Sequence, residues 1–581
     1  MAKTPKYDAK IKKILDATEP GERTCELTGE KWMMDEEEIG WYKKFNVPPA
    51  KLSPIERRRQ LWGFNAGLYI WWNQHAITRE RLLSYIHPDN FIKPIPDQEW
   101  HAEDWGSKVS AKIEPTANLF PQVKTLLQQI PLPAIRLFGE VKNTIGASII
   151  SAEDSFMVFG GVSKCKRCRY GYLVESDEDV VDSYRARSCT DCFAVNQCEK
   201  MYNCNYVLSC FECLDSSFLF DCRNCQHCYC SSNLRNSQYV FRNQKLSQAE
   251  YEKRIRGIDL SCHTVFERER QKFYMLLGND AVWPKNFNLS CEQSSGEYLR
   301  NCVRCKDCFS IGEAMDCYRS QMSQRGSEGC AYCSGFSGTS QSYEAVGVTN
   351  SSAIKFSTSV SNSLGLEYCH SCYNCENCFA CVGLKNKDYH ILNQSYQPEQ
   401  YWKLVDEIKC AMLDRGEYGQ FFPGDFSPAG FVFAADIFFD YQDHELKHFQ
   451  APTFDPARGA VISEKDEVVS ENIETDAIPD CLCELDEEQV IGKPIIDRQI
   501  NRQYSISKAD LAFYKKHRLP LPKQHFFSRV RELIRLGNLF STETQSCSSC
   551  GTEIKVATNP TFNNRKIYCQ ACYLKHLEQT T

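Results

Sequence analysis

The sequence predicts an α+β multidomain protein, in which a β-rich, duplicated, cysteine-filled solenoid resembling a β-helix is flanked at each end by a helical and zinc-ribbon module. Three observations predict this fold. Cysteines in the middle of the chain share a three-residue register, a cysteine-rich unit recurs 150 residues later, and a basic helical segment recurs 472 residues later. Self-similarity of this kind is typical of repeat architectures.

Composition limits the classes to which the chain can belong. Of its 581 residues 42% are hydrophobic and 12% aromatic, which is enough for packed cores, and the net charge of −7 gives no general affinity for nucleic acid. The amino terminus lacks the apolar core of a secretory signal, and the longest apolar runs are too short for a membrane helix. We therefore expect a cytoplasmic protein whose 33 cysteines are metal ligands or small core side chains more often than disulfides.

The register of the cysteines predicts coils. A six-residue period runs through this region, with Ser216 in the one position that lacks a thiol. Its members are Cys192, Cys198, Cys204, Cys210, Cys222 and Cys228. In a β-helix with one inward side chain per short strand, eighteen residues complete a coil, so Cys192, Cys210 and Cys228 are expected to stack. The thiols then fill a narrow core.

The first repeat is a cysteine-rich unit that occurs twice, with an offset of 150 residues. A shift of 150 residues aligns Cys225 with Cys375 and Tyr239 with Tyr389. Each copy continues from its cysteines through an extended stretch, "YVFRNQ" or "YHILNQ", into a predicted helix. Ser247 is the expected N-cap of the first of these helices.

The second repeat brackets the first. "WYKKFNVPPAKLSPIERRRQL" from Trp41 matches "FYKKHRLPLPKQHFFSRVREL" from Phe513, and a cysteine pattern follows only the second copy. Its two CxxC pairs are formed by Cys547, Cys550, Cys569 and Cys572. This is the spacing of a zinc ribbon, in which four thiolates hold one Zn²⁺ and leave no position open for a catalytic water. The amino-terminal module has no CxxC pair at the matching place, which predicts a degenerate ribbon.

A second set of two CxxC pairs, with nearly the same spacing, predicts another zinc site. These residues are Cys165, Cys168, Cys189 and Cys192. The runs "CVRCKDC" and "CHSCYNCENCFAC" resemble the cysteine stretch of iron–sulfur ferredoxins, although no proline follows the last cysteine. Metal binding and simple core packing both remain open for the cysteines of the middle region.

One catalytic pattern occurs in the chain. "DHELKH" contains His444, Glu445 and His448, an HExxH that on a helix would present two zinc ligands and a general base. Its surroundings, "FQAPTFDPARG" and an acidic stretch, offer little for a third ligand. A solvated helix is the alternative, and Glu445→Gln is then expected to leave the fold and any activity unchanged.

A basic arm precedes the carboxy-terminal ribbon. From Arg498 to Leu536 there are ten Lys or Arg and two acidic residues. Such a local excess predicts contact with phosphate, and the interleaved Phe513, Tyr514, Phe526 and Phe527 would stack on unpaired bases. The candidate nucleic-acid-binding residues are Lys515, Lys516, Arg518, Lys523, Arg529, Arg531 and Arg535. The alternative is that the aromatic residues pack under the ribbon.

The segments "FYKK", "CSSCGTEI", "IYCQACY", "DCRNCQHCYCSSNLRNSQY" and "YGQFFPGDFSP" together resemble an uncharacterised family of cysteine-rich zinc-ribbon proteins from candidate-phyla bacteria. The resemblance covers nearly the whole chain. It implies zinc at Cys547, Cys550, Cys569 and Cys572 but no activity. Members of that family often carry CxxC pairs in the amino-terminal module too, and this chain lacks them.

These observations divide the chain into five regions. They are an amino-terminal α+β module (1–140), two solenoid repeats (141–275 and 276–430), an acidic linker (431–495), and a basic helix with zinc ribbon (496–581). We expect a non-enzymatic, zinc-stabilised scaffold that binds nucleic acid or a ribonucleoprotein through the basic arm. A structural subunit that uses the solenoid as an interface and a metallopeptidase are the alternatives. Protein partners along the solenoid are candidates, and no membrane or small-molecule substrate is evident.

Overall fold

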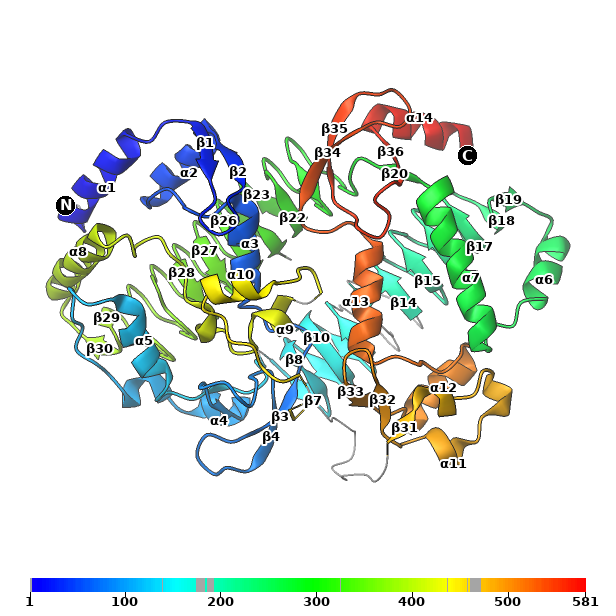
Figure 1. Ribbon diagram of the computed structural model, residues 1–581, viewed down its shortest axis with the longest axis horizontal. Coiled ribbons are helices and arrows are strands. Elements are labelled where there is room, and N and C mark those ends of the chain that lie inside the picture. Colours follow the sequence, from blue (N-terminus) through cyan, green and yellow to red (C-terminus); the bar gives the residue numbers. More distant parts are fainter. Residues whose placement is uncertain are drawn as a thin grey trace.

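The computed structural model describes residues 3–137, 139–173, 183–184, 193–323, 325–435, 437–456, 458–459 and 472–580. In these ranges the protein is mixed α/β, with fourteen α-helices and thirty-six strands. Two stacks of short parallel strands form its body, and a helical module from each end of the chain packs on them (Figure 1). Within the described part of the chain, no helix combines the length and the apolar character needed to cross a membrane.

The first stack comprises residues 145–245. Its ten-stranded sheet contains β8 (Ile145–Ile149), β10 (Phe156–Val162), β12 (Arg169–Tyr172), β13 (Ser183–Tyr184), β14 (Phe193–Asn196), β15 (Asn205–Leu208), β16 (Ser217–Phe220), β17 (Gln226–Ser232), β18 (Gln238–Phe241) and β19 (Gln244–Lys245). From β14 to β18 each strand pairs in parallel with the strand twelve residues further on, as Asn205 does with Ser217. The chain therefore returns to the same place every twelve residues.

A left-handed residue marks every corner of these coils. From Gln197 to Tyr239 every third residue has a φ between 46° and 58°. The residue after each corner is the one that faces inward, and the buried cluster inside this stack contains only such positions. Four sides of three residues therefore complete one coil, which explains why the cysteines keep a three-residue register.

The predicted eighteen-residue coil is wrong. Cys210 stacks between Cys198 and Cys222, because its N–H donates to the Cys198 Sγ at 3.4 Å and its own Sγ accepts from the Cys222 N–H at 3.5 Å. Cys192, which was expected in the same row, lies outside the described residues. A six-residue period divides both twelve and eighteen, so the period alone does not decide how many sides a coil has.

Ser and Cys are interchangeable inside the coils for the same reason. The Ser216 hydroxyl accepts from the Cys228 N–H at 3.0 Å, as the cysteine sulfurs do from the next coil. Both side chains are small, and both satisfy a backbone N–H that would otherwise be buried without a partner. Cys and Ser at inward positions thus combine small size with a hydrogen-bond acceptor, and Val, Leu and Met occupy other inward positions.

The second stack comprises residues 296–395. Its parallel strands are β21 (Gly296–Glu297), β22 (Cys308–Ile311), β24 (Gln321–Ser323), β26 (Ala331–Phe336), β27 (Tyr343–Val346) and β28 (Lys355–Thr358), and isolated bridges at the same twelve-residue step continue to Ile391. Its last coil ends in an antiparallel pair, β29 (His390–Ile391) with β30 (Gln394–Ser395). An Asn closes each stack: Asn243 accepts from the Ser232 N–H and the buried Asn393 from the Val382 N–H, both at 2.9 Å.

A helix follows each stack. These are α6 (Gln248–Arg256) and α8 (Pro398–Asp414), and α6 begins at the predicted cap, because the Ser247 side chain accepts from the Glu250 N–H. Tyr239 and Tyr251 meet edge to face at 5.8 Å, and the corresponding rings 150 residues later meet at 5.5 Å. After α6 the chain reaches the second stack through α7 (His263–Met275) and β20 (Val282–Pro284).

The amino-terminal module packs on the second stack. It contains α1 (Pro5–Asp16), β1 (Gly21–Thr24), β2 (Lys31–Met34), α2 (Glu36–Phe45), α3 (Pro54–Trp62), β3 (Trp71–Gln74), β4 (Arg81–Ser84), β5 (Pro94–Ile95), α4 (Asp97–Ala102) and α5 (Leu119–Leu127). The buried Arg57 of α3 forms an ion pair with Glu344 at 2.5 Å. Trp41 stacks on Tyr318 at 5.5 Å.

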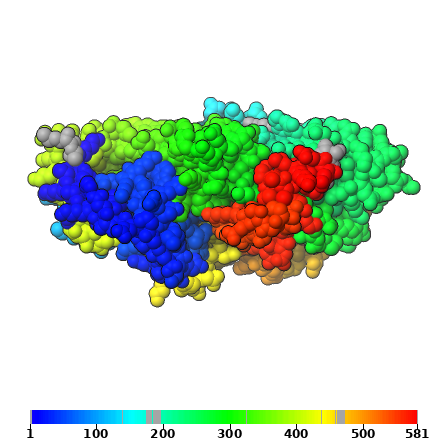
Figure 2. All heavy atoms as spheres, turned by 90° about the horizontal axis from the view of Figure 1, so that it is seen from above, coloured from blue at the N-terminus to red at the C-terminus, as the bar shows by residue number. Residues whose placement is uncertain are grey.

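The carboxy-terminal module packs on the first stack. It contains β32 (Ile495–Asp497), β33 (Arg502–Tyr504), α12 (Lys508–Lys516), α13 (Phe526–Leu536), β34 (Thr542–Ser546), β35 (Glu553–Ala557), β36 (Lys566–Tyr568) and α14 (Gln570–Thr580). Asn196 of the stack donates to the Leu533 carbonyl at 2.7 Å, and Arg169 pairs with Asp510 at 2.6 Å. The two end modules thus cross over the stacks, and in Figure 2 they lie next to each other.

The region predicted as an acidic linker is partly folded into the core. Residues 431–456 contain α9 (Phe431–Ala435) and α10 (Asp443–His448), and Phe431 is fully buried. Phe438 stacks on Phe540 at 4.5 Å, which joins this segment to the carboxy-terminal module. The acidic residues between 460 and 471 lie outside the described part of the chain.

We expect Asn236→Val to destabilise the protein by about 1–2 kcal/mol, because a β-branched residue is sterically disfavoured at the left-handed φ of 49° that this corner requires. Asn236→Gly is the matched control. It removes the same side-chain hydrogen bond from Asn224 but has no Cβ. Thermal and urea unfolding measure both variants, and equal losses would contradict the corner interpretation.

Candidate metal centre

The four carboxy-terminal cysteines lie in a β-hairpin and at the start of the last helix. The turn between β34 and β35 holds Cys547 and Cys550, whereas Cys569 and Cys572 follow β36 and begin α14. One sulfur from each lies within 4.8 Å of the other three. The structure therefore gathers these four residues, which the sequence predicted as ligands, into a group that could hold one metal ion.

Backbone N–H groups stabilise the thiolate form of Cys547, the form that binds a cation. The Cys569 N–H donates to the Cys547 sulfur at 3.2 Å. Burial by itself would raise the pKa of the Cys547 thiol, but the N–H groups of Cys569, Cys550 and Ser549 lower that pKa to about 6. A thiolate is the form that binds metal, so the turn favours the ligand state near neutral pH.

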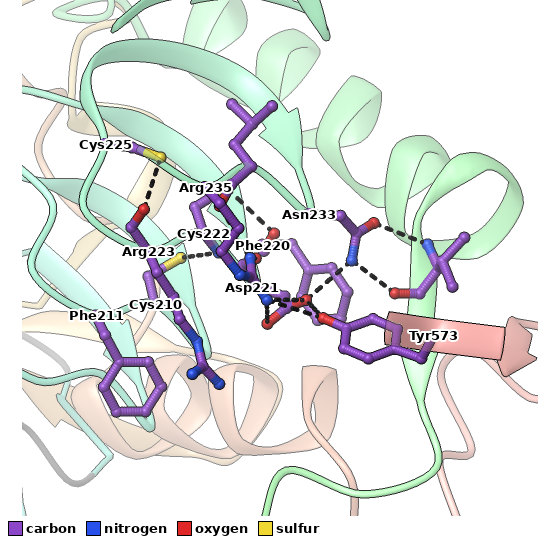
Figure 3. Close-up of polar contacts among 12 residues, drawn as sticks. Cys210, Phe211, Phe220, Asp221, Cys222, Arg223, Cys225, Asn233, Arg235 and Tyr573 are labelled. Atoms are coloured by element: carbon purple, nitrogen blue, oxygen red, sulfur yellow. Dashed lines mark hydrogen bonds and ion pairs between the residues drawn. The ribbon is translucent and has the colours of Figure 1, made fainter. Parts of the chain in front are cut away.

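The helix that carries two of these cysteines is anchored to the first stack. Tyr573, adjacent to Cys572, donates from its hydroxyl to the buried Asp221 (Figure 3). Arg235 also pairs with Asp221 at 3.1 Å, and Asn233 donates to the same carboxylate at 3.0 Å. β36 pairs in parallel with β20 between the stacks. The position of α14 therefore couples the cysteine group to the body of the protein.

Three further turns have the shape of the Cys547 turn. In that turn the Cys547 N–H donates to the Thr552 carbonyl at 2.8 Å and so closes the strand pair. Gly551, four residues after Cys547, is left-handed with a φ of 75°. The N–H after Cys547, that of Ser548, donates to Ile567 of the next strand at 2.8 Å. Each of the other three turns repeats part of this pattern without a set of four cysteines.

In the first of them Asp497 takes the place of Cys547. It ends β32, and the left-handed residue four positions on is Asn501 with φ of 50°. The Asp497 carboxylate accepts from the His525 N–H at 2.8 Å and from the Ser528 hydroxyl at 3.0 Å. His525 caps α13 just as Cys569 precedes α14. A carboxylate and a hydroxyl thus join the two halves of this turn without an ion.

In the second, Cys25 stands at the first position and Gly29 has φ of 72°. The Cys25 sulfur accepts from the Ser53 N–H at 3.4 Å, and the Glu26 N–H donates to the Lys51 carbonyl at 3.1 Å. Ser53 precedes α3. One cysteine of the pattern therefore remains, and it serves as a hydrogen-bond acceptor.

In the third, His75 stands at the first position and Arg79 has φ of 66°. The Ala76 N–H donates to the Pro94 carbonyl at 2.8 Å, as Ser548 does to its strand. The His75 Nε2 lies 3.1 Å from the Glu99 carboxylate of α4. A His–Glu contact thus closes this turn.

Sequence reasoning missed these three turns. The 472-residue repeat, extended in both directions, aligns Cys25 with Asp497 and His75 with Cys547. No residue of the turns themselves is identical between the copies, so only the shared hairpin geometry reveals the relation. The matching register of the strand pairs, Thr24 with Lys31 and Asp497 with Arg502, carries it.

The second predicted zinc site is not assembled from what the structure describes. Cys165 and Cys168 form a disulfide and are both buried. Cys189 and Cys192 lie outside the described residues, so the four-cysteine site they would complete stays a prediction. A further disulfide joins Cys262 to Cys481, whereas most other described cysteines are buried free thiols.

The ferredoxin-like cysteine runs are parts of the coils. Among the described residues, the groups of three or more possible ligands are the Cys547 group and Cys262 with Asp480 and Cys481, two of which form the disulfide. Neither the run from Cys302 nor the run from Cys369 contributes such a group. Their sulfurs face inward at successive sides of the coil and are fully buried. Core packing therefore accounts for them.

Among the described residues, the HExxH pattern forms no group of metal ligands. Glu445 lies in the six-residue helix α10 and is bound by Arg59, with contacts of 2.6 and 2.7 Å to its two oxygens. Burial would raise the pKa of Glu445, but the hydrogen bonds from Arg59 and from the Gln442 N–H bring the pKa below its ordinary value. His444 and His448 belong to no ligand group in the described ranges. The carboxylate is engaged in structure and is not presented as a base.

The aromatic residues of the basic arm are not available for stacking on bases. Phe513, Tyr514, Phe526 and Phe527 are all buried, with at most 6% of each exposed. Phe526 stacks on Phe159 of the first stack at 6.0 Å. The prediction of base stacking by these residues is wrong, because α12 buries Phe513 and Tyr514 and the amphipathic α13 buries Phe526 and Phe527.

The charges of the arm separate into three groups. Lys515, Lys516 and Arg518 are exposed at the end of α12, and Lys515 pairs with Glu487 at 2.6 Å. On α13, Arg531 and Arg535 bind Asp440 at 2.6 and 2.9 Å. Lys523 and Arg529 line a cavity against the first stack. The predicted arm is therefore no continuous phosphate-binding surface.

Comparison with known proteins gives little guidance. No protein-family model matches the chain, and no curated protein matches it either. One solved structure, a "putative acetyltransferase from Desulfovibrio desulfuricans G20", is 9% identical over an alignment that covers 57% of this chain and 94% of that chain. Its TM-score is 0.10, so it carries no argument about fold or function.

We expect Glu445→Gln to lower the stability by about 1–3 kcal/mol, because it removes a charged partner of the nearly buried Arg59, and to leave the metal content unchanged. This replaces the expectation of an unaltered fold. His448→Asn, which leaves Arg59 and Glu445 paired, is the control. Unfolding midpoints and elemental analysis measure the effects. Metal loss in either variant would revive the metallopeptidase hypothesis.

Proposed function

We propose that the protein is a non-enzymatic binding scaffold stabilised by one Zn²⁺, with two β-helix-like solenoids as its body. The gathering of four cysteine sulfurs within 4.8 Å of one another at the carboxy terminus carries this proposal. A closed set of four protein ligands supplies folding energy, whereas a catalytic zinc keeps one position open for water. The role of the ion would therefore be structural.

Zinc is the metal that these ligands favour. Four thiolates from two short turns suit tetrahedral Zn²⁺, which has no redox chemistry of its own. Of the ligands, Cys547 is buried and Cys550 is exposed, so the site lies near the surface. Uncompensated thiolates would repel one another, and a divalent cation removes that repulsion.

The ion would hold the ribbon in the orientation in which it packs on the first stack. Tyr573 reaches the buried Asp221 only if α14 keeps its direction from the hairpin, and β36 pairs with β20 in the same region. Loss of the ion is therefore expected to loosen the contact between the ribbon and the first stack. The three related turns use internal hydrogen bonds instead and need no ion.

We expect protein purified without added metal to contain about one zinc per chain, and Cys569→Ser to reduce this strongly and to lower the unfolding temperature. Cys483→Ser is the matched control, since Cys483 is an exposed cysteine outside the group. Elemental analysis and thermal unfolding are the measurements. Iron as the main metal, or full zinc content in Cys569→Ser, would refute the assignment.

A nucleic-acid or ribonucleoprotein partner is a second element of the proposal. It is supported by the exposed Lys515, Lys516 and Arg518, which extend from the end of α12. Exposed cations contact phosphates without reading bases, and the aromatic residues that would add stacking are buried. Binding of this kind is expected to be independent of sequence and sensitive to salt.

The alternative is a structural subunit that uses a solenoid face as its interface. It is supported by a shallow groove of about 640 Å³ on the second stack. Rows of polar side chains at the twelve-residue step line it, including Asn350, Asn362 and Asn374. A regular polar surface of this kind suits an extended protein partner.

We expect the combined change of Lys515, Lys516 and Arg518 to Ala to weaken binding of single-stranded RNA about tenfold and to reduce the salt slope by about two to three. The change of Lys43 and Lys44 to Ala is the control, since these exposed lysines hold the corresponding positions 472 residues earlier. Electrophoretic shifts at several salt concentrations measure binding. Absence of any salt-sensitive shift at micromolar protein would leave the scaffold without a nucleic-acid partner.

A further inference from the structure

A cavity of about 330 Å³ lies where α7 and α13 meet the first stack. Its walls come from β14 and β15 of the stack, from α7, and from the proline-containing turn at 520–524 that leads into α13. α7 and α13 are held together by Arg270, which donates to Glu532 at 3.0 Å. The volume falls within the range of small-molecule sites.

The amino-terminal module forms a related cavity at the equivalent place. This second cavity, of about 480 Å³, is lined by residues 48–52, 57 and 60, and their counterparts 472 residues later line the first. The two stacks contribute corresponding strands to the two cavities. Glu344 of β27 lines the second cavity, and β14, 150 residues earlier in the sequence, lines the first. The duplication has therefore produced two comparable interfaces with a hollow in each.

The two cavities differ in whether an acidic side chain pairs with their lysine. Lys51 pairs with Glu26 at 3.4 Å in the amino-terminal cavity. The residue that corresponds to Glu26 is Arg498, which has the opposite charge and pairs with Glu474. Within the described ranges the ammonium of Lys523, the counterpart of Lys51, forms no ion pair, and it lines the cavity. One cation is thus available to an anion that enters here.

The carboxylates of the cavity do not cancel this charge. Arg270 binds Glu267 at 2.6 Å as well as Glu532 at 3.0 Å, and the Tyr274 hydroxyl also donates to Glu532. Both acids of the lining are thus bound by Arg270, and neither pairs with Lys523; outside the lining, Asp480 acts on Lys523 only through a longer-range electrostatic interaction. Burial lowers the pKa of His263, so this basic group of the lining is neutral at pH 7.

Four aromatic rings form one side of the lining. Phe193 lies 5.9 Å from Phe266 and 6.4 Å from Tyr514, and Tyr206 lies 6.0 Å from Phe266. These rings form a continuous wall beside the charged turn. A flat apolar body would gain burial and ring contacts on this wall.

We propose that the cavity between α7 and α13 binds a small organic anion with an aromatic body, whose ring packs on the aromatic wall and whose charged group meets Lys523. The geometry assigns no reaction to the site, and the proposal does not depend on zinc. The amino-terminal cavity, with its lysine already paired, has lost this specificity for an anion.

The fluorescent probe 8-anilinonaphthalene-1-sulfonate tests the proposal, with the neutral N-phenyl-1-naphthylamine as its counterpart of nearly the same shape. In titrations of the full chain, we expect Lys523→Ala to raise the Kd of the sulfonate about five- to tenfold, because it removes a charged partner, and to change the Kd of the amine less than about twofold. Lys51→Ala is the matched control and is expected to leave both values unchanged.

A second variant addresses binding elsewhere on the protein. Gln524→Trp adds a large ring to the lining and is expected to abolish saturable binding of both probes while the unfolding temperature and the metal content stay as in the unaltered protein. The proposal is overturned if the sulfonate binds Lys523→Ala as tightly as the unaltered protein. It is overturned equally if Lys51→Ala has the same effect, or if the probes bind Gln524→Trp normally.

Discussion

The three-residue side of the coils is the constraint on which the rest of the structure depends. A left-handed corner at every third residue turns the chain so sharply that one side chain per side points inward, four to a coil. The narrow space between four such sides favours compact residues, although Met201 and Phe336 also enter it, and it favours an acceptor for the N–H of the next coil. Cysteine and serine satisfy both demands, so the thiols follow from geometry before any metal is considered.

Each stack has a surface that an end module covers, and each module covers the stack that is farther from it in the sequence. The amino-terminal module covers the second stack through α3, and the carboxy-terminal module covers the first through α13. The two modules meet where Arg58 donates to the Phe540 carbonyl at 2.7 Å. The two modules thus join the two stacks into one body. Each interface contains a cavity, and the lysine of only one of them, Lys51, pairs with an acid among the described residues.

The four related turns are closed by side chains of different chemistry. Where Cys547 has three cysteine partners, Asp497 has an N–H and a hydroxyl, and His75 has Glu99. Each substitute joins the same two pieces of chain, the hairpin turn and the start of the next helix. Sequence reasoning found the single turn with all four cysteines from its spacing, but polar replacements of different chemistry leave no shared residue for an alignment to detect.

The sequence by itself determined the mixed α/β composition, the small inward residues of the coils and the ligands of the carboxy-terminal group, because these depend on local spacing and residue type. Only the tertiary structure decided the twelve-residue coil, since a six-residue period fits more than one number of sides until parallel strands pair. It also decided that Phe526 is buried and that Glu445 is bound by Arg59. Those outcomes depend on partners hundreds of residues away, and no local pattern encodes which distant surface a side chain will meet.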